Sequence, residues 1–147
     1  MIAANKRAGL DYEIGERYEA GLELTGAEAK SFREGRVDIT GSHVKVIGAE
    51  IYLINSNFYA EGRDLRRTRR LLMHKKEIVR LGTKAKELGL TLVPIRLYTT
   101  RSGRPGRGGR LVKLELGMGK PRRLPDKRKK LKDREIEREV ARELKFR

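Results

Sequence analysis

The chain is short, strongly basic and free of cysteine: its 147 residues carry 36 lysines and arginines against 20 acidic residues, a formal net charge of +16. The absence of cysteine excludes disulfide bonds and thiolate metal sites. The apolar runs are too short to cross a bilayer, and residues 1–5 lack the apolar core of a signal peptide. We therefore expect a small cytoplasmic protein whose partner is a polyanion, with nucleic acid favoured over a membrane surface.

The first elements predicted along the chain are a strand and a short helix. Residues 12–24 alternate between apolar and polar side chains, as in a half-buried strand, with a bend at Gly15. Thr25 and Glu28 have the spacing of a capping box, in which each side chain accepts a hydrogen bond from the other residue's backbone N–H. A helix should start there and end before Gly35, which favours the left-handed conformation that closes helices.

A hairpin and a second helical region follow. Residues 44–53 alternate on both sides of Gly48, which predicts two antiparallel strands joined by a tight turn. Residues 74–88 carry an apolar stripe at helical spacing. Gly82 is expected to break this helix into two pieces, and Gly89 to end it.

Two more strands complete the predicted body. Residues 90–98 are rich in β-branched and aromatic side chains, and Pro94 among them favours an edge or a bulge. Residues 111–116 are partly apolar on both faces, as in the wall of a barrel. With about six short strands and two or three short peripheral helices, the sequence predicts a mainly β protein, a small antiparallel barrel of the OB type.

Arginine is concentrated in two loops of this body. Residues 63–70 contain five arginines, and residues 101–110 read RSGRPGRGGR. Arginines spaced by glycine are typical of segments that follow a nucleic-acid backbone without reading its sequence. We favour RNA contact for the second loop, and a flexible hairpin tip is the alternative.

The composition changes near Gly117. Residues 118–147 hold 13 basic and 6 acidic residues, so charge is denser there than in the body. Apolar side chains recur near helical spacing at Leu131, Ile136, Val140 and Leu144. A lone helix of this kind is marginal in water. We predict an RNA-binding domain at 1–117 and a basic tail at 118–147, disordered when free and helical on a partner. The alternative is a permanently disordered tail that adds solubility.

The sequence contains no recognisable catalytic constellation. His43 and His74 do not have the spacing of a metal site. Residues 117–120 read GMGK, but a phosphate-binding loop is longer and has Ser or Thr after the lysine, where Pro121 stands here. We therefore predict that the protein is not an enzyme and needs neither metal nor cofactor.

Two carboxylates in the first strand require a separate interpretation. Glu16 and Glu19 could bind a metal by geometry alone, but their place in an alternating strand favours solvated side chains. Glu19 could also accept hydrogen bonds from a base edge, or orient a neighbouring arginine. An exposed strand charge without a role is the alternative.

Seven short blocks, spread over nearly the whole chain, carry a family resemblance. In order they read NKRA at 5–8, YEAG at 18–21, EAKSFREGR at 28–36, IYLIN at 51–55, RRLLMHK at 69–75, GLTLVP at 89–94 and DKR at 126–128. Each block alone is a weak signal, whereas seven in this order are specific. The chain resembles the small protein B (SmpB) family, the SsrA-binding proteins of bacteria.

The resemblance implies a function in trans-translation. Members of this family have an oligonucleotide-binding β-barrel that binds the tRNA-like domain of transfer-messenger RNA and escorts it to ribosomes stalled on truncated messages. Their C-terminal tail enters the empty mRNA channel and folds as a helix beside the decoding centre. The expected partners are thus transfer-messenger RNA and ribosomal RNA, and the expected state is a monomer.

The resemblance also assigns individual residues. It places RNA contacts at Asn5, Glu19 and Leu72. It places the ribosome-binding tail motif at Gly119, Lys120, Asp126, Lys127 and Arg128. Basic side chains near these blocks are further candidates for RNA contact by charge: Lys6, Arg7, Lys30, Arg33, Arg36, Arg69 and Arg70.

Two other functions compete with this interpretation. A permanent ribosomal component would have the same charge and would sediment stoichiometrically with unstalled ribosomes. An RNA-processing enzyme would need a metal-dependent activity that is lost when Glu16 or Glu19 is replaced.

Overall fold

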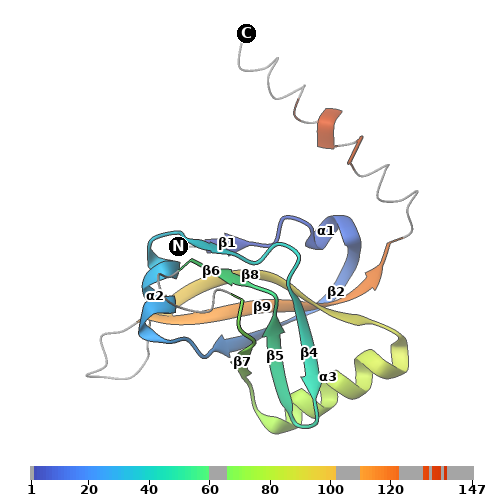
Figure 1. Ribbon diagram of the computed structural model, residues 1–147. Coiled ribbons are helices and arrows are strands. Elements are labelled where there is room, and N and C mark those ends of the chain that lie inside the picture. Colours follow the sequence, from blue (N-terminus) through green and yellow to red (C-terminus); the bar gives the residue numbers. More distant parts are fainter. Residues whose placement is uncertain are drawn as a thin grey trace.

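The computed structural model describes residues 2–59, 66–101 and 110–122, and residues 131–132, 134–136 and 138 of the C-terminal segment. The body consists of short helices around antiparallel strands (Figure 1). Its elements are β1 (Ile2–Ala4), α1 (Ala8–Asp11), β2 (Tyr12–Leu22), α2 (Gly26–Arg33), β3 (Val37–Asp38), β4 (His43–Ile47), β5 (Glu50–Ile54), β6 (Asn57–Phe58), β7 (Arg69–Leu72), α3 (Lys75–Leu88), β8 (Thr91–Arg101) and β9 (Arg110–Pro121).

One sheet dominates the architecture. Seven strands pair antiparallel in the order β1-β8-β9-β2-β7-β5-β4, and β3 and β6 form a separate two-stranded sheet. Figure 1 shows that β4 and β5 run across the direction of β8 and β9, so the sheet is strongly curved, with α3 beside β4 and β5. The prediction of a mainly β, antiparallel protein with few helices is confirmed.

Local sequence signals account for several of these elements. The capping box forms: Thr25 Oγ1 accepts from the Glu28 N–H at 3.3 Å, and Glu28 Oε1 accepts from the Thr25 N–H at 2.9 Å. The hairpin of β4 and β5 turns at Gly48, whose φ of 63° favours glycine. An edge strand or a bulge was predicted at Pro94. β8 lies between β1 and β9, so it is not an edge, and the β8–β9 register shifts between Pro94 and Arg96, as at a bulge.

Helix α3 contradicts one expectation. It runs without interruption from Lys75 to Leu88 and ends at Gly89, whereas Gly82 was expected to break it. A glycine costs about 1 kcal/mol inside a helix, which burial of Ile78 and Leu81 outweighs. Gly82 also faces β4, since a Cβ atom there would lie 3.1 Å from Val46 Cγ1. The small residue therefore serves close packing.

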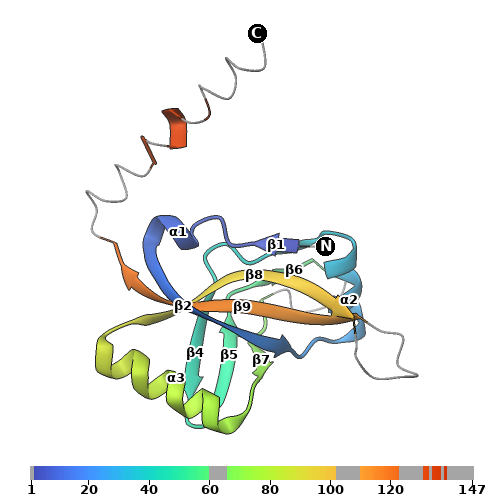
Figure 2. The same cartoon turned by 180° about the vertical axis from the view of Figure 1, so that it is seen from behind.

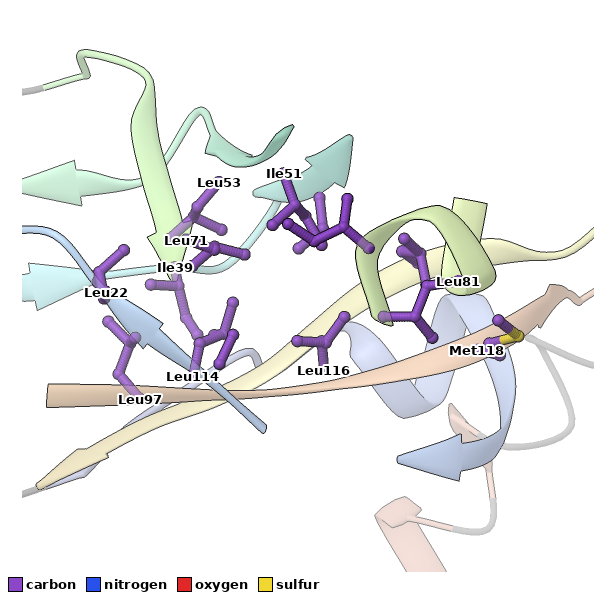
Figure 3. Close-up of a cluster of buried hydrophobic side chains, with 14 of the residues drawn as sticks. Leu22, Ile39, Ile51, Leu53, Leu71, Leu81, Leu97, Leu114, Leu116 and Met118 are labelled. Carbon is purple, nitrogen blue, oxygen red and sulfur yellow. The ribbon is translucent and has the colours of Figure 1, made fainter. Parts of the chain in front are cut away.

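The hydrophobic core lies on one face of the curved sheet. Figure 3 shows leucines of β2, β7, β8 and β9 pointing toward the side chains of β5 and α3. The fully buried members include Ile39, Ile51, Leu53, Leu97, Leu114 and Leu116. Because side chains of a strand alternate between faces, the other face of these strands remains available for polar groups.

The end of β9 corrects the predicted domain boundary. β9 continues to Pro121, and Met118 is 3 % exposed, so residues 118–121 belong to the folded body and the boundary after residue 117 is four residues too early. Gly117 and Gly119 resemble strand breakers in the sequence. A Cβ at Gly119 would lie 2.7 Å from Val93 Cγ2 and 2.9 Å from Tyr12 Cβ, so close strand packing requires glycine there.

The described residues of the C-terminal segment, 131–132, 134–136 and 138, are helical. The prediction that the tail is disordered when free concerns residues mostly outside the described ones and stays a prediction. In the part of the chain that the structure describes, no helix is long and apolar enough to span a membrane.

Candidate nucleic-acid interface

The outer face of the sheet is polar across the adjacent strands β2, β9 and β8. Ala20, Leu97 and Leu114 are buried in the core, so their strand neighbours point the opposite way. Figure 2 shows these strands crossing the body side by side. We call this surface the polar face, and its members are Arg17, Glu19, Arg96, Tyr98, Lys113 and Glu115.

Glu19 holds a defined position on the polar face. Its carboxylate accepts a hydrogen bond from the Tyr98 hydroxyl and another from Lys113 Nζ at 2.5 Å. The hydrogen bonds from Lys113 and Tyr98 lower the pKa of Glu19, so the side chain is ionised at neutral pH. Burial and the hydrogen bond to Glu19 raise the pKa of Tyr98 to about 12. A carboxylate has about four acceptor positions, so Glu19 can accept further hydrogen bonds from the amino groups of a base.

Glu115 organises the second half of the polar face. Arg17 Nη1 lies 2.8 Å from Glu115 Oε1, and Arg96 Nε lies 2.8 Å from Oε2. The Arg96 guanidinium also stacks over the Tyr98 ring, 4.7 Å from its centroid. The hydrogen bond from Arg96, followed by that from Arg17, lowers the pKa of Glu115. Both carboxylates of the face are thus paired with cations, which limits their repulsion of phosphates.

Leu72 borders the polar face on the side of β7. It pairs with Gly21, and a Cβ atom at Gly21 would lie 3.3 Å from Leu72 Cβ. Leu72 is 47 % exposed, although it is a large apolar residue. An exposed leucine beside fixed polar groups can pack against a base or a sugar. The structure therefore brings two of the residues assigned by resemblance, Glu19 and Leu72, onto one surface.

Asn5 lies at the opposite border, beside β8. Its Nδ2 donates to the Pro94 carbonyl oxygen at 2.8 Å, and its Oδ1 accepts from the Arg7 N–H at 3.1 Å. The carboxamide therefore shapes the loop that presents the exposed side chains of Lys6 and Arg7. Direct RNA contact by these three residues stays a prediction.

Arg69 is not part of the surface, and its predicted RNA contact is wrong. Its side chain is 0 % exposed, with Nε 2.5 Å from Glu28 Oε2 and its guanidinium carbon 4.1 Å from the Phe58 ring centroid. Arg69 alternates in step with Leu71, which faces the core, whereas Arg70 points outward. That shared parity with Leu71 is the sequence signal that would have placed Arg69 inside.

The carboxylate that receives Arg69 is also buried. Glu28 is 2 % exposed and accepts from Arg67 Nη2 at 2.5 Å as well. Burial by itself would raise the pKa of Glu28, but the hydrogen bonds from Arg67 and the Thr25 N–H, with the charge of Arg69, lower it to about 2. This ion cluster joins the start of α2 to β7.

The basic candidates near α2 lie apart from the polar face. Figure 2 shows α2 at the ends of β2, β8 and β9. The basic side chains there, Lys30, Arg33 and Arg36, are solvent-exposed. They form a second basic area rather than an extension of the polar face. Arg36 Nε lies 3.7 Å from Glu34 Oε2, a weak surface pair.

The residues assigned to the tail motif separate into two groups. Gly119 and Lys120 lie in β9, where their partners in β2 are Ile14 and Glu13. Gly119 is buried and Lys120 is exposed. The other assigned residues, at 126–128, lie outside the described residues, as do residues 102–109 of the arginine-rich loop and residues 63–65 of the other.

Several contacts were missed by sequence reasoning. The alternation of β8 and β9 was visible, but only strand pairing shows that Arg96, Tyr98 and Lys113 meet Glu19. Arg122 was also missed, and it makes three hydrogen bonds to the backbone around α1. Among the described residues, no group of three or more His, Cys, Asp or Glu side chains could hold a metal ion.

Comparison with known proteins places the chain in a family. The sequence model of the family described as "SmpB protein" matches residues 2–146. The SsrA-binding protein of Carboxydothermus hydrogenoformans is 40% identical over 153 residues, covering 100% of this chain and 97% of that protein. The SsrA-binding protein of Thermosipho melanesiensis is 43% identical over 151 residues, covering 99% and 98%.

A solved structure supports the same assignment. A chain of the structure described as "tmRNA-SmpB: a journey to the center of the bacterial ribosome" is 40% identical, with a TM-score of 0.63, and the match covers 86% of this chain and 92% of that one. Identity at this level over nearly the full length of both chains reflects common ancestry as well as a common fold. The resemblance carried by the seven blocks is confirmed, and the chain belongs to the SmpB family.

Proposed function

We propose that this protein binds the tRNA-like domain of transfer-messenger RNA and delivers it to stalled ribosomes, where its C-terminal segment probes the empty mRNA channel and the decoding centre. It acts as a monomer in the cytoplasm, without catalysis or cofactor. The relatives named SsrA-binding protein and the ribosomal tmRNA–SmpB structure support the choice of RNA. The observation that carries the proposal to this chain is the polar face, where a fixed, ionised Glu19 lies beside the exposed Leu72.

The polar face suits folded RNA better than a membrane surface. A membrane binder needs cations and an apolar rim, and gains nothing from fixed carboxylates. Glu19 and Glu115 instead provide directional acceptors and hold the surrounding cations in place. Acceptors fixed on a sheet surface can recognise base edges that are splayed out of a helix, as in the loops of folded RNA.

We infer that the curved sheet forms a barrel of the OB type. Its edge strands are β1 and β4, and β4 contacts β8 without pairing with it. A groove of about 590 Å³ runs along this seam and is lined by residues of β4, α3 and the start of β8. In OB-type barrels the binding surface lies on the outer side of the strands, as the polar face does here.

Basic groups outside the polar face would add affinity through phosphates. Each cation placed on a phosphate releases counterions, so binding should weaken steeply as salt rises. For the RNA we propose contacts from Asn5, Lys6, Arg7, Lys30, Arg33, Arg36 and Arg70. For the ribosome we propose Lys120 and the motif Asp126, Lys127 and Arg128, with Gly119 acting through the packing of β9.

The decisive test replaces Glu19 and, in a separate control variant, Glu16, a carboxylate of the same strand with similar hydrogen-bond partners. Glu16 also accepts hydrogen bonds from a tyrosine and a lysine, Tyr18 and Lys84. Its partner Lys84 belongs to α3, away from the polar face. We expect Glu19→Gln to weaken binding of the isolated tRNA-like domain about 10- to 100-fold, because charge-assisted hydrogen bonds are lost. Glu16→Gln should stay within about twofold.

Filter binding or fluorescence titration at fixed ionic strength measures both variants. Either substitution removes a negative charge, which on its own would strengthen binding to RNA. Equal losses for the two variants would therefore mean that Glu19 has no special role, and the polar face would not be the binding site. Stoichiometric sedimentation of the wild-type protein with unstalled ribosomes would instead favour a permanent ribosomal component.

A further inference from the structure

The point at which the chain leaves β9 is tied to the backbone around α1. Tyr12 and Pro121 form the last pair of the β2–β9 ladder, and proline has no N–H with which to continue it. The next N–H, that of Arg122, donates to the Asp11 carbonyl oxygen at 2.8 Å. The Arg122 guanidinium turns the same way, and its Nε donates to the carbonyl oxygens of Gly9 at 3.1 Å and Tyr12 at 3.2 Å.

These carbonyl groups are the ones that a helix end leaves without intrahelical donors. α1 has only four residues, Ala8–Asp11, and few hydrogen bonds of its own. Arg122 therefore closes the C-terminal end of α1 while it anchors the chain that follows β9. Ala8 and Leu10 are buried and hold α1 against the body.

The other end of α1 carries the loop at the border of the polar face. The Asn5 N–H donates to the Ile95 carbonyl oxygen at 2.8 Å, and the Ala8 N–H donates to the Asn5 carbonyl oxygen at 3.3 Å. Along the helix, Arg7 Nη2 lies 3.1 Å from Asp11 Oδ1. A continuous set of contacts thus connects Asn5, through α1, to Arg122.

We propose that Arg122 is a positioning residue, which fixes the point and direction at which the C-terminal segment leaves the body and connects that point, through α1, to the loop around Asn5. This inference rests on the proposed function, in which the body and the segment engage different RNAs at once. A tethered segment finds its site faster when its starting point is confined, because its effective concentration there is higher. The close packing of Gly119 against Val93 and Tyr12 also fixes the end of β9, just before Arg122.

The test measures the exit geometry directly. The chain contains no cysteine, so cysteines introduced at Lys45 in β4 and at Leu124, two residues after Arg122, can carry spin labels that report the exit point itself. Arg122→Ala should at least about double the width of the distance distribution, as expected for a freely pivoting linker. Arg122→Lys, which keeps the charge without the planar guanidinium, should give an intermediate width. Lys86→Ala, an equal loss of charge on α3, should leave the width unchanged.

The same variants separate positioning from binding. Arg122→Ala should bind the tRNA-like domain within about twofold of wild type, yet tag nascent chains on stalled ribosomes about tenfold more slowly. An unchanged distance distribution, or unchanged tagging, would overturn the proposal. Failure of the wild-type protein itself to bind the RNA would overturn the proposed function instead, while the distance measurement would still decide the role of Arg122.

Discussion

Replacing Glu28 with glutamine should lower the free energy of unfolding by about 3–5 kcal/mol, among the largest effects of any single substitution in the body. The change removes the charge that compensates Arg69, whose side chain is 0 % exposed and cannot turn to solvent. Glutamine can still accept the capping-box hydrogen bond from the Thr25 N–H, so the loss reports the missing charge rather than a lost cap. Urea unfolding followed by circular dichroism measures the difference.

Glu34 provides the control on the same helix. Its carboxylate is 43% exposed and its only described ion pair, with Arg36, is 3.7 Å long. Glu34→Gln should change the free energy of unfolding by no more than about 0.5 kcal/mol. Similar effects of the two substitutions would show that the buried ion cluster contributes no more than a surface pair.

The buried carboxylate of Glu28 also predicts how the stability of the protein depends on pH. The pKa of Glu28 is about 2 in the folded protein, against 4.5 for an ordinary glutamate. A lowered pKa stabilises the fold above the unfolded value, and this stabilisation is lost as the pH falls from about 4.5 toward about 2. The difference corresponds to about 3 kcal/mol. Glu28→Gln should remove this loss of stability at acid pH. If the free energy of unfolding of the variant depended on pH as that of the wild type does, the prediction would be wrong.

Deleting residues 123–147 should separate the two activities of the protein. The truncated chain keeps all of β9 and Arg122, so we expect binding of the tRNA-like domain within about twofold of wild type. Tagging on stalled ribosomes should fall at least about a hundredfold, because the contacts of the C-terminal segment and its effective concentration are lost together. A reconstituted translation reaction with a truncated message measures tagging.

A second truncation, after Gly117, is the contrasting variant. It removes Met118, which is 3 % exposed, and the strand pairs of Gly119, Lys120 and Pro121 with β2. Loss of one buried methionine alone costs about 2–5 kcal/mol, so the melting temperature should drop sharply. If this chain were as stable as the one that ends at Arg122, residues 118–121 would not belong to the folded body.

Features determined by neighbouring residues were the ones that the sequence predicted well. The capping box of Thr25 and Glu28 and the turn at Gly48 depend on contacts within a few residues. The bulge at Pro94 follows from the missing N–H of proline. The alternation of apolar and polar side chains predicted the longer strands, and the number of strands predicted a mainly β fold.

Features determined by residues far apart in the chain could not be predicted from the sequence. Glycine usually interrupts a helix or a strand, yet Gly82 in α3 and Gly119 in β9 each lie where another element approaches too closely for a side chain. Arg69 belongs to an arginine-rich run that predicts a surface, but Glu28, 41 residues away along the chain, draws it inside. No local pattern distinguishes a glycine that ends an element from one that allows close packing.

The sequence by itself determined the family, the charge and the longer strands and helices of the body, because blocks, composition and periodicity are properties of the chain alone. It did not predict the short elements α1, β1, β3, β6 and β7, which have too few residues to show a period. Only the tertiary structure decided which side chains form the polar face and where the body ends. Pairing of β2, β9 and β8 brings Lys113 and Tyr98 to Glu19, across sequence separations of 94 and 79 residues. The same pairing carries β9 to Pro121 and sets Arg122 against α1, because strand register, unlike strand propensity, depends on the partner strand.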